Sequence, residues 1–558
     1  MASYPYLNPL ESFEKLANEN PKNVYLRRAQ GDNWVEWTFE QSLSYVKKLA
    51  SALKNAGLNK GDKVAIVSKN CPEWFLCDLA IWGAGGVSVP LYTTLEGEEM
   101  DPLLEHSEAK FLFIGRLDFW KKQVKTLKSE VPRICFDSSP QQSCQNISSF
   151  VNANNGVENF DLHFAEENDL ASIIYTSGTT GTPKGVMHNF STFSFGGQGV
   201  VDVMGVTTKD RAFSYLPLAH VAERLLLQTV SLYGGNSVSF PESLNRFPQN
   251  LKDTSPTFFL AVPRIWEKFK EKVEAKLGKD KINFLRKNPI GRFLLKRLIP
   301  KALGLKDARH CLTGAAPINL DTLKWYQDIG LPIEEAYGST ENFAYSHWNR
   351  HFKSEMGSIG RPLPGVLERI DSENEELQTL SPTNMAGYYK AEDTTKSVFT
   401  ESDRYYKTGD LVRRNERGSL FIRGRAKDTF KTAKGEFIDP NKLENLICEK
   451  LGVGFTAVTG LGLGQPIAIL PLPKDQLHSN EQKNLFVKGL KEVNSEILSH
   501  EKLDKLIVVE ESWFGETSPL LTPTQKLKRP ALNEHIQPYV SEWLKSRESV
   551  VVHPTAIS

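Results

Sequence analysis

A run rich in glycine, serine and threonine, closed by a lysine, is the part of the sequence that most clearly indicates chemistry. It reads Thr176-Ser-Gly-Thr-Thr-Gly-Thr-Pro-Lys184 and follows Ala171–Tyr175, an apolar segment typical of a buried strand. Glycines let the backbone turn so that successive N–H groups point at one anion, and hydroxyls and a lysine ammonium add donors. The Gly-Lys-Ser/Thr ending of the P-loop is missing. Composition alone leaves two interpretations open, an anion-binding loop or a flexible surface loop.

Two later segments carry acidic and aromatic residues. In Glu335–Glu341, Tyr337 offers a flat ring face, and Glu341 offers hard oxygen ligands for a hard cation such as Mg²⁺. In Tyr405–Leu411, the Asp410 carboxylate can accept hydrogen bonds from two neighbouring hydroxyls, or Asp410 can be an ordinary turn residue. Each segment on its own therefore has a structural as well as a functional interpretation.

In chain order these segments resemble the motifs of the adenylate-forming superfamily, which includes acyl-CoA synthetases, adenylation domains and luciferases. Twelve consecutive residues from Tyr175 to Val186 are similar to its phosphate-binding signature, and the resemblance runs from about residue 10 to residue 540. The resemblance implies that Gly314–Pro317 and Tyr337 contact adenine and that Asp410 and Arg425 contact the ribose. The full set of residues that it assigns to ATP is Thr176, Ser177, Gly178, Thr179, Thr180, Gly181, Lys184, Gly314, Ala315, Ala316, Pro317, Glu335, Tyr337, Gly338, Asp410 and Arg425.

The same resemblance implies catalytic roles. The catalytic set is His220, Thr340, Glu341, Lys431 and Lys526, with Glu341 and Thr179 as the residues that hold Mg²⁺. Lys526 is expected to bridge the carboxylate substrate and the α-phosphate, and the Lys431 loop is expected to enter the site for thioester formation. Lys427 lies at the hinge position, about which the C-terminal domain is expected to rotate between the two steps. Without its motif, Lys526 would be an ordinary solvated lysine.

The fold is expected to be α/β, with a mobile C-terminal domain. Up to about residue 400, helical segments such as Glu40–Ala56 alternate with short apolar strands such as Lys63–Ser68, which indicates mostly parallel sheets flanked by helices. Beyond that point the strands are short, and a small α+β domain is expected. The predicted division is 1–424 for the AMP- and acyl-binding domain and 425–558 for the lid that carries the catalytic lysine.

The implied reaction is ATP-dependent activation of an acid. Leu216–Arg224, Ala261–Lys268 and Leu521–Lys528 most resemble long-chain fatty acyl-CoA synthetases, which implies fatty acid, ATP, Mg²⁺ and CoA. A fatty-acyl-AMP ligase, a CoA ligase for a medium-chain or aryl acid, and an inactive nucleotide-binding scaffold are the alternatives. One departure from the family pattern is Glu376–Pro382, which stands where glycine usually follows the strand.

Composition and charge exclude some classes of protein and indicate the expected cellular location. A net charge of +1 argues against a nucleic-acid binder. The six cysteines show neither zinc-site spacing nor a disulfide framework, so free thiols are expected. The N-terminus lacks a signal-peptide pattern, and the longest apolar run, Phe75–Val89, is too short for a membrane span of about 20 residues. A cytoplasmic protein is therefore expected, and a homodimer is possible.

One segment is strongly basic. Between Arg264 and Arg309 the chain has 15 Lys or Arg and 5 Asp or Glu, and apolar residues alternate with basic ones from Ile290 to Leu298. Such a basic amphipathic segment suits either peripheral contact with an anionic membrane surface or a solvated helix packed on the protein.

Overall fold

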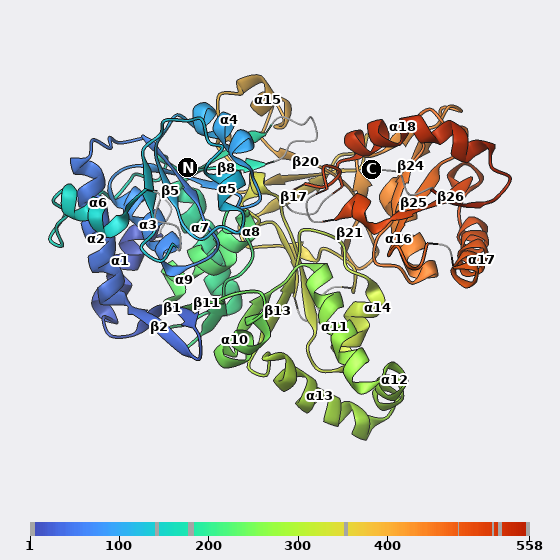
Figure 1. Cartoon of the computed structure of the whole chain (residues 1–558), viewed down its shortest axis with the longest axis horizontal. Coiled ribbons are helices and arrows are strands. Elements are labelled where there is room, and N and C mark those ends of the chain that lie inside the picture. Colours follow the sequence, from blue (N-terminus) through green and yellow to red (C-terminus); the bar gives the residue numbers. More distant parts are fainter. Residues whose placement is uncertain are drawn as a thin grey trace. The chain divides into compact units, whose positions relative to one another are not determined.

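The computed structural model describes residues 6–139, 144–176, 183–350, 355–477, 479–515, 518–522 and 527–553. It divides into two compact units (Figure 1). The first holds the described residues up to 368 together with 379–406, and the second holds 369–378 and the described residues from 407 onward. The predicted α/β class is confirmed. The functional division of the chain after residue 424 stays a prediction.

The largest sheet of the first unit has eight strands, with helices packed on both faces. In order they are β19 (Gly387–Tyr388), β9 (Lys184–Asn189), β8 (Leu170–Thr176), β4 (Val87–Leu91), β3 (Lys63–Val67), β5 (Ala109–Ile114), β6 (Arg133–Cys135) and β7 (Gln145–Asn146). Pairing is parallel from β8 to β7, whereas β9 is antiparallel to both β8 and β19. Val64 and Ile66 belong to one core and Ala65 and Val67 to another, because successive strand residues face opposite ways.

Helices cover both faces of this sheet, and the helix predicted at Glu40–Ala56 is found at Phe39–Asn55, within one residue at each end. On one face lie α2 (Phe39–Asn55), α3 (Pro72–Gly83) and α7 (Phe190–Met204), and on the other lies α4 (Gly97–Ser107). Thr38 caps α2 in a capping box with Gln41. The apolar run from Phe75 forms the fully buried α3 and β4. Across the described ranges, no helix has both the length and the apolar character needed to cross a bilayer.

Two smaller sheets complete the first unit. The five-stranded sheet is β12 (Phe258–Leu260), β13 (His310–Thr313), β14 (Ile333–Tyr337), β15 (His347–Asn349) and β16 (Arg361–Pro362). Its helices include α11 (Pro263–Leu277), α12 (Lys279–Lys287), α13 (Pro289–Leu303) and α14 (Leu320–Asp328). The four-stranded sheet is β10 (Arg211–Phe213), β11 (Ser237–Phe240), β1 (Val24–Gln30) and β2 (Asn33–Thr38), and α1 (Pro9–Glu19) shares its core.

The second unit is built on two sheets and a hairpin. One sheet is β17 (Leu367–Ile370), β18 (Glu376–Leu380), β20 (Tyr406–Arg414) and β21 (Leu420–Arg425), of which the ends of three strands fall in the first unit. The hairpin is β22 (Phe430–Lys431) and β23 (Phe437–Ile438). The last sheet is β24 (Ala457–Thr459), β25 (Ile467–Leu472), β26 (Lys505–Glu510) and β27 (Val550–Val552), packed with α16 (Pro440–Leu451), α17 (Asn480–Glu496) and α18 (Arg529–Lys545).

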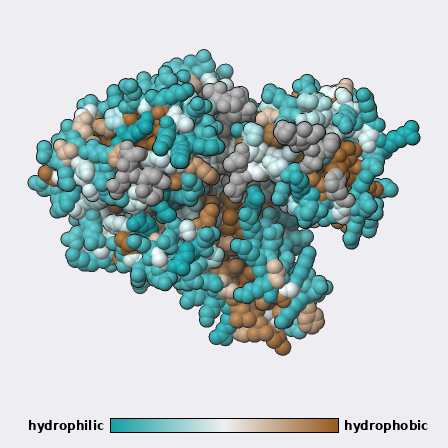
Figure 2. All heavy atoms as spheres, in the orientation of Figure 1, coloured by the Kyte–Doolittle hydropathy of each residue, from teal (hydrophilic) through white to brown (hydrophobic). Residues whose placement is uncertain are grey.

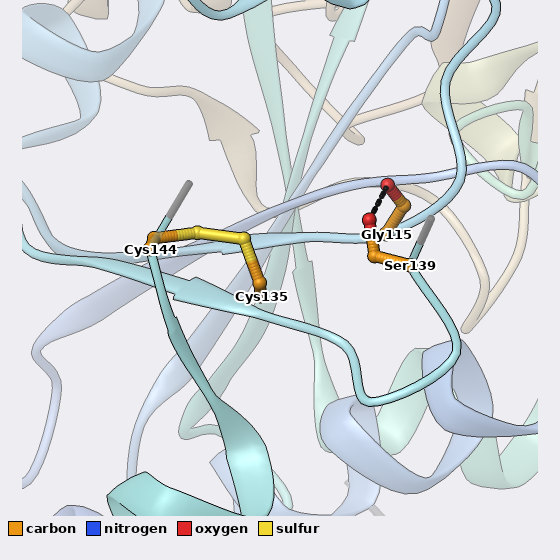
Figure 3. The surroundings of a disulfide bond; sticks show 4 residues. All are labelled: Gly115, Cys135, Ser139 and Cys144. Atoms are coloured by element: carbon orange, nitrogen blue, oxygen red, sulfur yellow. Dashed lines mark hydrogen bonds between the residues drawn. A yellow bond between two sulfur atoms is a disulfide. The ribbon is translucent and has the colours of Figure 1, made fainter. Parts of the chain in front are cut away.

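Two of the six cysteines form a disulfide, which corrects the expectation of free thiols. Cys135 at the end of β6 and Cys144 next to β7 are bonded, with their Cα atoms 5.7 Å apart (Figure 3). The sequence did not indicate this pair, because the two cysteines meet only when β6 and β7 become neighbours in the sheet. Cys71, Cys77, Cys311 and Cys448 are free.

A buried ion pair ties the helices of the largest core together. Arg224 begins a π-helix, Arg224–Thr229, and donates to both oxygens of Asp78 on α3 at 3.0 and 2.9 Å, with both side chains fully buried. Gln228 donates to the same carboxylate at 2.8 Å. Removing either charge would leave the other buried without its partner, which costs several kcal/mol in typical proteins, about 3–5. The pair therefore fixes the position of the segment that starts at His220.

Glu223, next in the chain to Arg224, is a buried carboxyl group in a polar cluster. Its Oε1 accepts hydrogen bonds from the Ser214 hydroxyl at 2.7 Å, the Tyr215 N–H at 2.9 Å and the Asn70 amide at 3.2 Å. Burial raises the pKa of Glu223 from 4.5 to about 8, because desolvation outweighs these hydrogen bonds. The folded protein therefore binds this proton more tightly than the unfolded chain does.

This difference in pKa makes stability depend on pH. Between about pH 4.5 and about pH 8 the free energy of unfolding falls as pH rises, by at most about 1.4 kcal/mol per unit from this group. Glu223→Gln imitates the neutral acid and should remove that slope, so that the variant matches the wild type near pH 5 and exceeds it near pH 8. Urea unfolding across this range measures the effect. Glu19→Gln, an exposed position on α1, is the control. An equal stability difference at both pH values would contradict the assignment.

Candidate functional site

The glycine-rich run is anchored at both ends by one pair of strands. Thr176 ends β8, Lys184 begins β9, and the two residues face each other in the antiparallel register. The two ends of the run are thus fixed relative to each other by backbone pairing. The predicted phosphate-binding residues Ser177, Gly178, Thr179, Thr180 and Gly181 lie outside the described residues, so their roles stay predictions.

Lys184 lies beside an aromatic residue that the sequence analysis did not single out. Its ammonium nitrogen is 5.2 Å from the ring centroid of Tyr388, within the range of a cation–π interaction. The contact follows from the sheet, because β19 pairs with β9 and sets Tyr388 opposite Val186, two residues beyond Lys184. The cation of the run is therefore held at the β8–β9–β19 edge.

Tyr388 also holds Glu341, the predicted Mg²⁺ ligand. Its hydroxyl donates to Oε1 of Glu341 at 2.9 Å, and the backbone carbonyl of Glu341 accepts from the Met385 N–H at 2.7 Å. Burial, and then the neighbouring Glu341 carboxylate, hold the pKa of the Tyr388 hydroxyl well above its usual value, so it remains a donor. Lys184, Tyr388 and Glu341 form a continuous chain of contacts from a cation to a carboxylate. We call these three residues the Lys–Tyr–Glu relay.

The turn predicted to contact adenine lies against the strand that leads to Tyr337. Gly314–Pro317 follows β13, which pairs in parallel with β14 so that Thr313 faces Glu335. A Cβ at Gly314 would lie 2.8 Å from the carbonyl oxygen of Ala336, so glycine allows this approach. Ala315, Ala316 and Pro317 are exposed.

Tyr337 is held at the end of β14 by ring packing. Its ring meets the His347 ring edge-on, with centroids 5.8 Å apart. The next residue, Gly338, lies so close to the backbone of Ala344 that a Cβ there would be 2.6 Å from the Ala344 Cα. Thr340 and Glu341 follow directly in a single 3₁₀ turn. A flat ring and a carboxylate are thus presented from one tightly packed segment.

Glu335 has an environment unlike that of Glu341. Its Oε2 accepts from the Gly357 N–H at 2.9 Å, and burial raises the pKa of the carboxyl to about 7, against the lowering effect of that hydrogen bond. A group with this pKa exchanges its proton near neutral pH. It is therefore less suited than Glu341 to be a permanently charged ligand.

The described residues fit a magnesium ion only in part. Among them there is no group of three or more His, Cys, Asp or Glu side chains arranged to hold a metal. Within this part of the chain the Glu341 carboxylate accepts one hydrogen bond, so lone pairs remain for a cation. Mg²⁺ is commonly held by one or two carboxylates together with substrate phosphates and water. Glu341 can supply the one carboxylate ligand that such a site needs from the protein. Thr179, the other predicted ligand, lies outside the described residues.

His220 is fixed by local hydrogen bonding. It caps the short helix α8 (Val221–Glu223), and its Nδ1 accepts from the Ala222 N–H at 3.2 Å. Accepting there places the ring proton of the neutral imidazole on Nε2. The side chain is half-buried and directly precedes the segment that Glu223 and Arg224 anchor. Its orientation is thus determined, whereas its predicted catalytic role stays a prediction.

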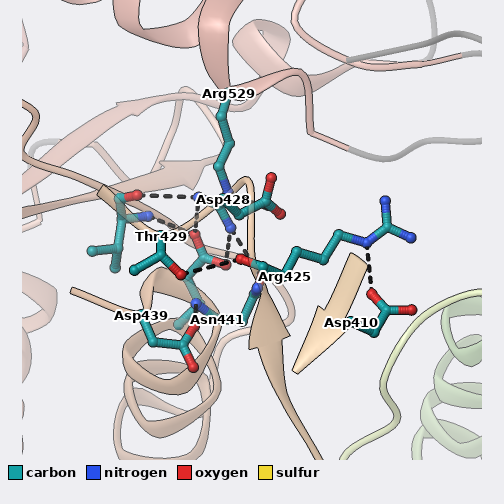
Figure 4. Close-up of polar contacts among 9 residues, drawn as sticks. Asp410, Arg425, Asp428, Thr429, Asp439, Asn441 and Arg529 are labelled. Atoms are coloured by element: carbon teal, nitrogen blue, oxygen red, sulfur yellow. Dashed lines mark hydrogen bonds and ion pairs between the residues drawn. The ribbon is translucent and has the colours of Figure 1, made fainter. Parts of the chain in front are cut away.

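In the second unit the structure brings together the two predicted ribose contacts. Asp410 on β20 faces Arg425 on β21 in the register, and Oδ1 of Asp410 accepts from Nε of Arg425 at 3.0 Å (Figure 4). Asp410 is buried, while 46% of the Arg425 side chain is exposed. Lys427, the predicted hinge residue, is exposed in the turn that follows β21. A carboxylate steadied by an arginine suits recognition of paired hydroxyls.

Gly409, the residue before Asp410, is held in place by the segment Glu376–Pro382, which departs from the family pattern. Oε1 of Glu376 accepts from the Gly409 N–H at 2.7 Å, and the Thr408 hydroxyl donates to the Leu377 carbonyl at 2.7 Å. Gly409 has a φ of 74°, in the region that favours glycine. Glu376 is therefore a positioning residue, and the sequence analysis did not indicate that role.

The remaining catalytic predictions lie further along the second unit. Lys431 is exposed and ends β22, opposite Phe437 in the hairpin register. Lys526 lies outside the described residues, although Leu521 and Leu527 on either side of it pair with each other. Just beyond, Arg529 donates to both oxygens of Glu444 at 2.8 Å and lies 3.5 Å from Asp428 (Figure 4). The sequence analysis did not single out Arg529, which joins the start of α18 to α16 and the turn after β21.

Comparison with known proteins agrees with the motif order and the fold. The sequence profile of the family described as AMP-binding enzyme matches residues 13–389. A Xenopus laevis protein named long-chain-fatty-acid–CoA ligase ACSBG2 is 26% identical, over 95% of this chain and 83% of its own length. A Dictyostelium discoideum protein named fatty acyl-CoA synthetase A is 28% identical, over 91% of this chain and 85% of its own.

A solved structure shares the fold over nearly the whole chain. The crystal structure of the anthranilate CoA ligase AuaEII, in complex with anthranoyl-AMP, aligns with a TM-score of 0.76 and 20% identity and covers 96% of this chain and 98% of that one. At that identity the match concerns the fold. The family profile extends over more than half of the chain and includes the β8–β9 run, Glu341 and Tyr388. The chain therefore belongs to the AMP-binding enzyme family, the adenylate-forming superfamily.

Proposed function

We propose that this protein is a long-chain fatty acid–CoA ligase, which converts ATP, a fatty acid and CoA into acyl-CoA, AMP and diphosphate. The observation that carries the adenylation chemistry is the Lys–Tyr–Glu relay, which sets a cation and a carboxylate beside the glycine-rich run. The preference for a long acyl chain is supported by the names of the Xenopus and Dictyostelium relatives, at 26% and 28% identity.

The first half-reaction makes the carboxylate reactive. A carboxylate oxygen attacks the α-phosphorus of ATP, the bond from that phosphorus to the diphosphate oxygen breaks, and acyl-AMP and diphosphate result. Lys184 would bind phosphate oxygens, Tyr337 would stack on adenine, and Asp410 would accept from the ribose hydroxyls. Lys526 would neutralise charge that develops between the carboxylate and the α-phosphate. Mg²⁺ bound at Glu341 would supply further charge neutralisation on the phosphates.

The second half-reaction transfers the acyl group. The CoA sulfur attacks the acyl carbonyl carbon, the bond from that carbon to the AMP oxygen breaks, and the thiol proton leaves to solvent or a base. The Lys431 hairpin is the segment we propose for this step, and we propose that His220 acts on the carboxylate or nucleotide side of the site. Lys526 and Lys431 both fall in the predicted lid domain, 425–558, so we propose that rotation about Lys427 exchanges them at the site.

The alternatives differ in measurable products. A fatty-acyl-AMP ligase would stop after the first step, and a CoA ligase for a medium-chain or aryl acid would use the same steps with a different acid. A nucleotide-binding scaffold would bind ATP and form neither product.

An acid-dependent ATP–diphosphate exchange screen tests the proposal. We expect palmitate and oleate to stimulate exchange well above octanoate and benzoate, because each buried methylene adds about 0.8 kcal/mol to binding. Product analysis with and without CoA then separates a ligase of acyl-CoA from a ligase of acyl-AMP. Greater stimulation by benzoate or anthranilate would favour the aryl alternative, and no stimulation by any acid would favour the scaffold.

The predicted role of Lys526 can be tested by measuring the two half-reactions separately. Lys526→Ala should slow acyl-AMP formation by at least about 100-fold, the usual cost of removing one group that stabilises developing charge. The same variant should still convert supplied acyl-AMP and CoA into acyl-CoA at a rate near that of the wild type. Lys528→Ala, two residues further along, is the matched control. Equal loss of both half-reactions in Lys526→Ala would rule the assignment out.

The relay makes a prediction about magnesium. Tyr388→Phe keeps the ring beside Lys184 and removes the hydroxyl from Glu341, so the Mg²⁺ concentration for half-maximal exchange should rise by about tenfold, equivalent to one hydrogen bond to a charged group. Exchange at saturating Mg²⁺ should change little. Titration calorimetry of Mg²⁺-ATP against AMP gives a second readout, in which only the Mg²⁺-ATP affinity weakens.

The neighbouring tyrosine provides a matched control. The Tyr389 hydroxyl donates to Glu108 at 2.9 Å, so Tyr389→Phe also removes one hydroxyl with a carboxylate partner. It should leave the Mg²⁺ dependence unchanged. If Tyr388→Phe and Tyr389→Phe behave alike, Tyr388 does not position a metal ligand.

A further inference from the structure

The helices α12 and α13 form a hairpin, residues 279–303, which we call the basic hairpin. It lies at the lower end of the first unit in Figure 1. One side of the hairpin packs into the protein: Ile282, Leu295 and Ile299 are buried in a core that also contains Trp266 and Trp325. The hairpin is therefore a fixed part of the fold, with a defined outer side.

That outer side carries large apolar side chains. The exposed fractions are 68% for Phe284, 73% for Ile290, 65% for Phe293, 45% for Leu294 and 60% for Leu298. On α13, Ile290, Leu294 and Leu298 are four residues apart and form a single row along the helix. Figure 2 shows the corresponding hydrophobic patch at this end of the molecule. Single exposed apolar residues are ordinary, but a contiguous set on one element marks an interaction surface.

The same surface is strongly cationic. Residues 281–301 contain seven Lys or Arg and no Asp or Glu. Arg286 and Arg292 are both paired with Asp328 on α14. The other five are exposed, and none has an ion pair with a carboxylate among the described residues: Lys281, Lys287, Lys296, Arg297 and Lys301.

This charge is a local feature of the chain. The whole protein has a net charge of only +1, whereas residues 264–309 have 15 basic and 5 acidic residues. An anionic bilayer has charged headgroups at its surface and apolar acyl chains beneath them. The exposed apolar row and the unpaired cations beside it are complementary to such a surface. Phosphate or nucleic acid alone would leave the apolar row without a partner.

A second copy of the chain is a poor occupant for the same surface. In a two-fold dimer the same patch lies on both subunits, so the five unpaired cations of each hairpin would be brought together. Protein interfaces are also depleted of lysine at their centre. Charge therefore favours a lipid surface over self-association.

We propose that the basic hairpin docks this protein on anionic phospholipid membranes. Phe284, Ile290, Phe293 and Leu298 enter the boundary between headgroups and acyl chains, and the unpaired lysines and Arg297 lie among the headgroup phosphates. The contact is peripheral and reversible, with no segment crossing the bilayer. It stands on the surface of α12 and α13 and is independent of which acid the protein activates.

Sedimentation with lipid vesicles, without ATP or acid, tests the proposal. The full chain should bind phosphatidylcholine vesicles that contain about 30 mol% phosphatidylglycerol at about 0.05 M NaCl, and about 0.5 M NaCl should release it, because salt screens these charges. Pure phosphatidylcholine vesicles should bind weakly or not at all. Absence of binding to the anionic vesicles, or binding to both kinds with no effect of salt, would overturn the proposal.

Variants identify the surface. The double variant Phe293→Ser, Leu298→Ser and the triple variant Lys287→Gln, Arg297→Gln, Lys301→Gln should each weaken binding by at least about tenfold, since both apolar burial and charge contribute. The matched control is Phe119→Ser, Leu244→Ser, two apolar residues of the first unit with exposed fractions of 61% and 82%. It should bind like the wild type. Equal binding by all three variants would place the contact elsewhere on the chain.

Solution mass distinguishes the competing occupant. Multi-angle light scattering without vesicles should give the same mass for the wild type and for Phe293→Ser, Leu298→Ser. A wild-type dimer that this variant dissociates would show that the hairpin is an interface between copies, and would overturn membrane docking. All these substitutions are at exposed positions, and thermal unfolding checks that each variant is folded. Diphosphate exchange with a water-soluble acid, measured in parallel, keeps failure of the proposed reaction separate from failure of docking.

Discussion

The pairing of β9 with two antiparallel neighbours is the constraint on which the candidate nucleotide site of the first unit depends. On one side β8 sets Thr176 opposite Lys184, and on the other β19 sets Tyr388 opposite Val186. A shift of one residue in either register would turn every side chain of that strand to the opposite face. Lys184 would then leave Tyr388, and Tyr388 would leave Glu341, so the strand register determines whether the cation and the carboxylate lie close together.

The parts of the fold set by local patterns could be predicted from the sequence. The helical spacing of Leu43, Val46, Leu49 and Leu53 corresponds to α2, and Lys63–Ser68 corresponds to β3 within one residue. Tyr337, Glu341, Asp410 and Arg425 were predicted through motifs. The structure places Asp410 against Arg425, and the roles of all four in ATP binding and catalysis stay proposals.

Contacts between distant parts of the chain could not be predicted in this way. Tyr388 is 47 residues from Glu341, and Arg224 is 146 residues from Asp78. No periodicity or local spacing connects such pairs, because the sheet order brings them together. The pairing of Cys135 with Cys144 has the same origin, although the two are only nine residues apart. Local patterns therefore located the elements, whereas the partners of their side chains required the topology.

The buried charges show how this chain uses polar groups to fix positions. Asp78 and Arg224 satisfy each other in a core where an isolated charge would be costly, and they orient the segment that His220 begins. Glu223 beside them has no ion pair with a cation among the described residues, and burial therefore raises its pKa. A buried pair of this kind contributes little net stability compared with apolar packing, so its effect is better described as specifying one arrangement of α3 and the π-helix.

In the second unit, Glu376 is another buried polar group that fixes the position of a neighbouring segment. Its carboxylate is buried and accepts a hydrogen bond from the Gly409 N–H. Gly409 is in a left-handed conformation directly before Asp410. This hydrogen bond therefore restrains the turn that orients Asp410, the residue predicted to bind the ribose. Asp410 is then steadied from the other side by Arg425. A carboxylate whose backbone and side chain are both held loses little conformational freedom on binding a ligand, and in this chain Glu376 contributes the backbone part of that restraint.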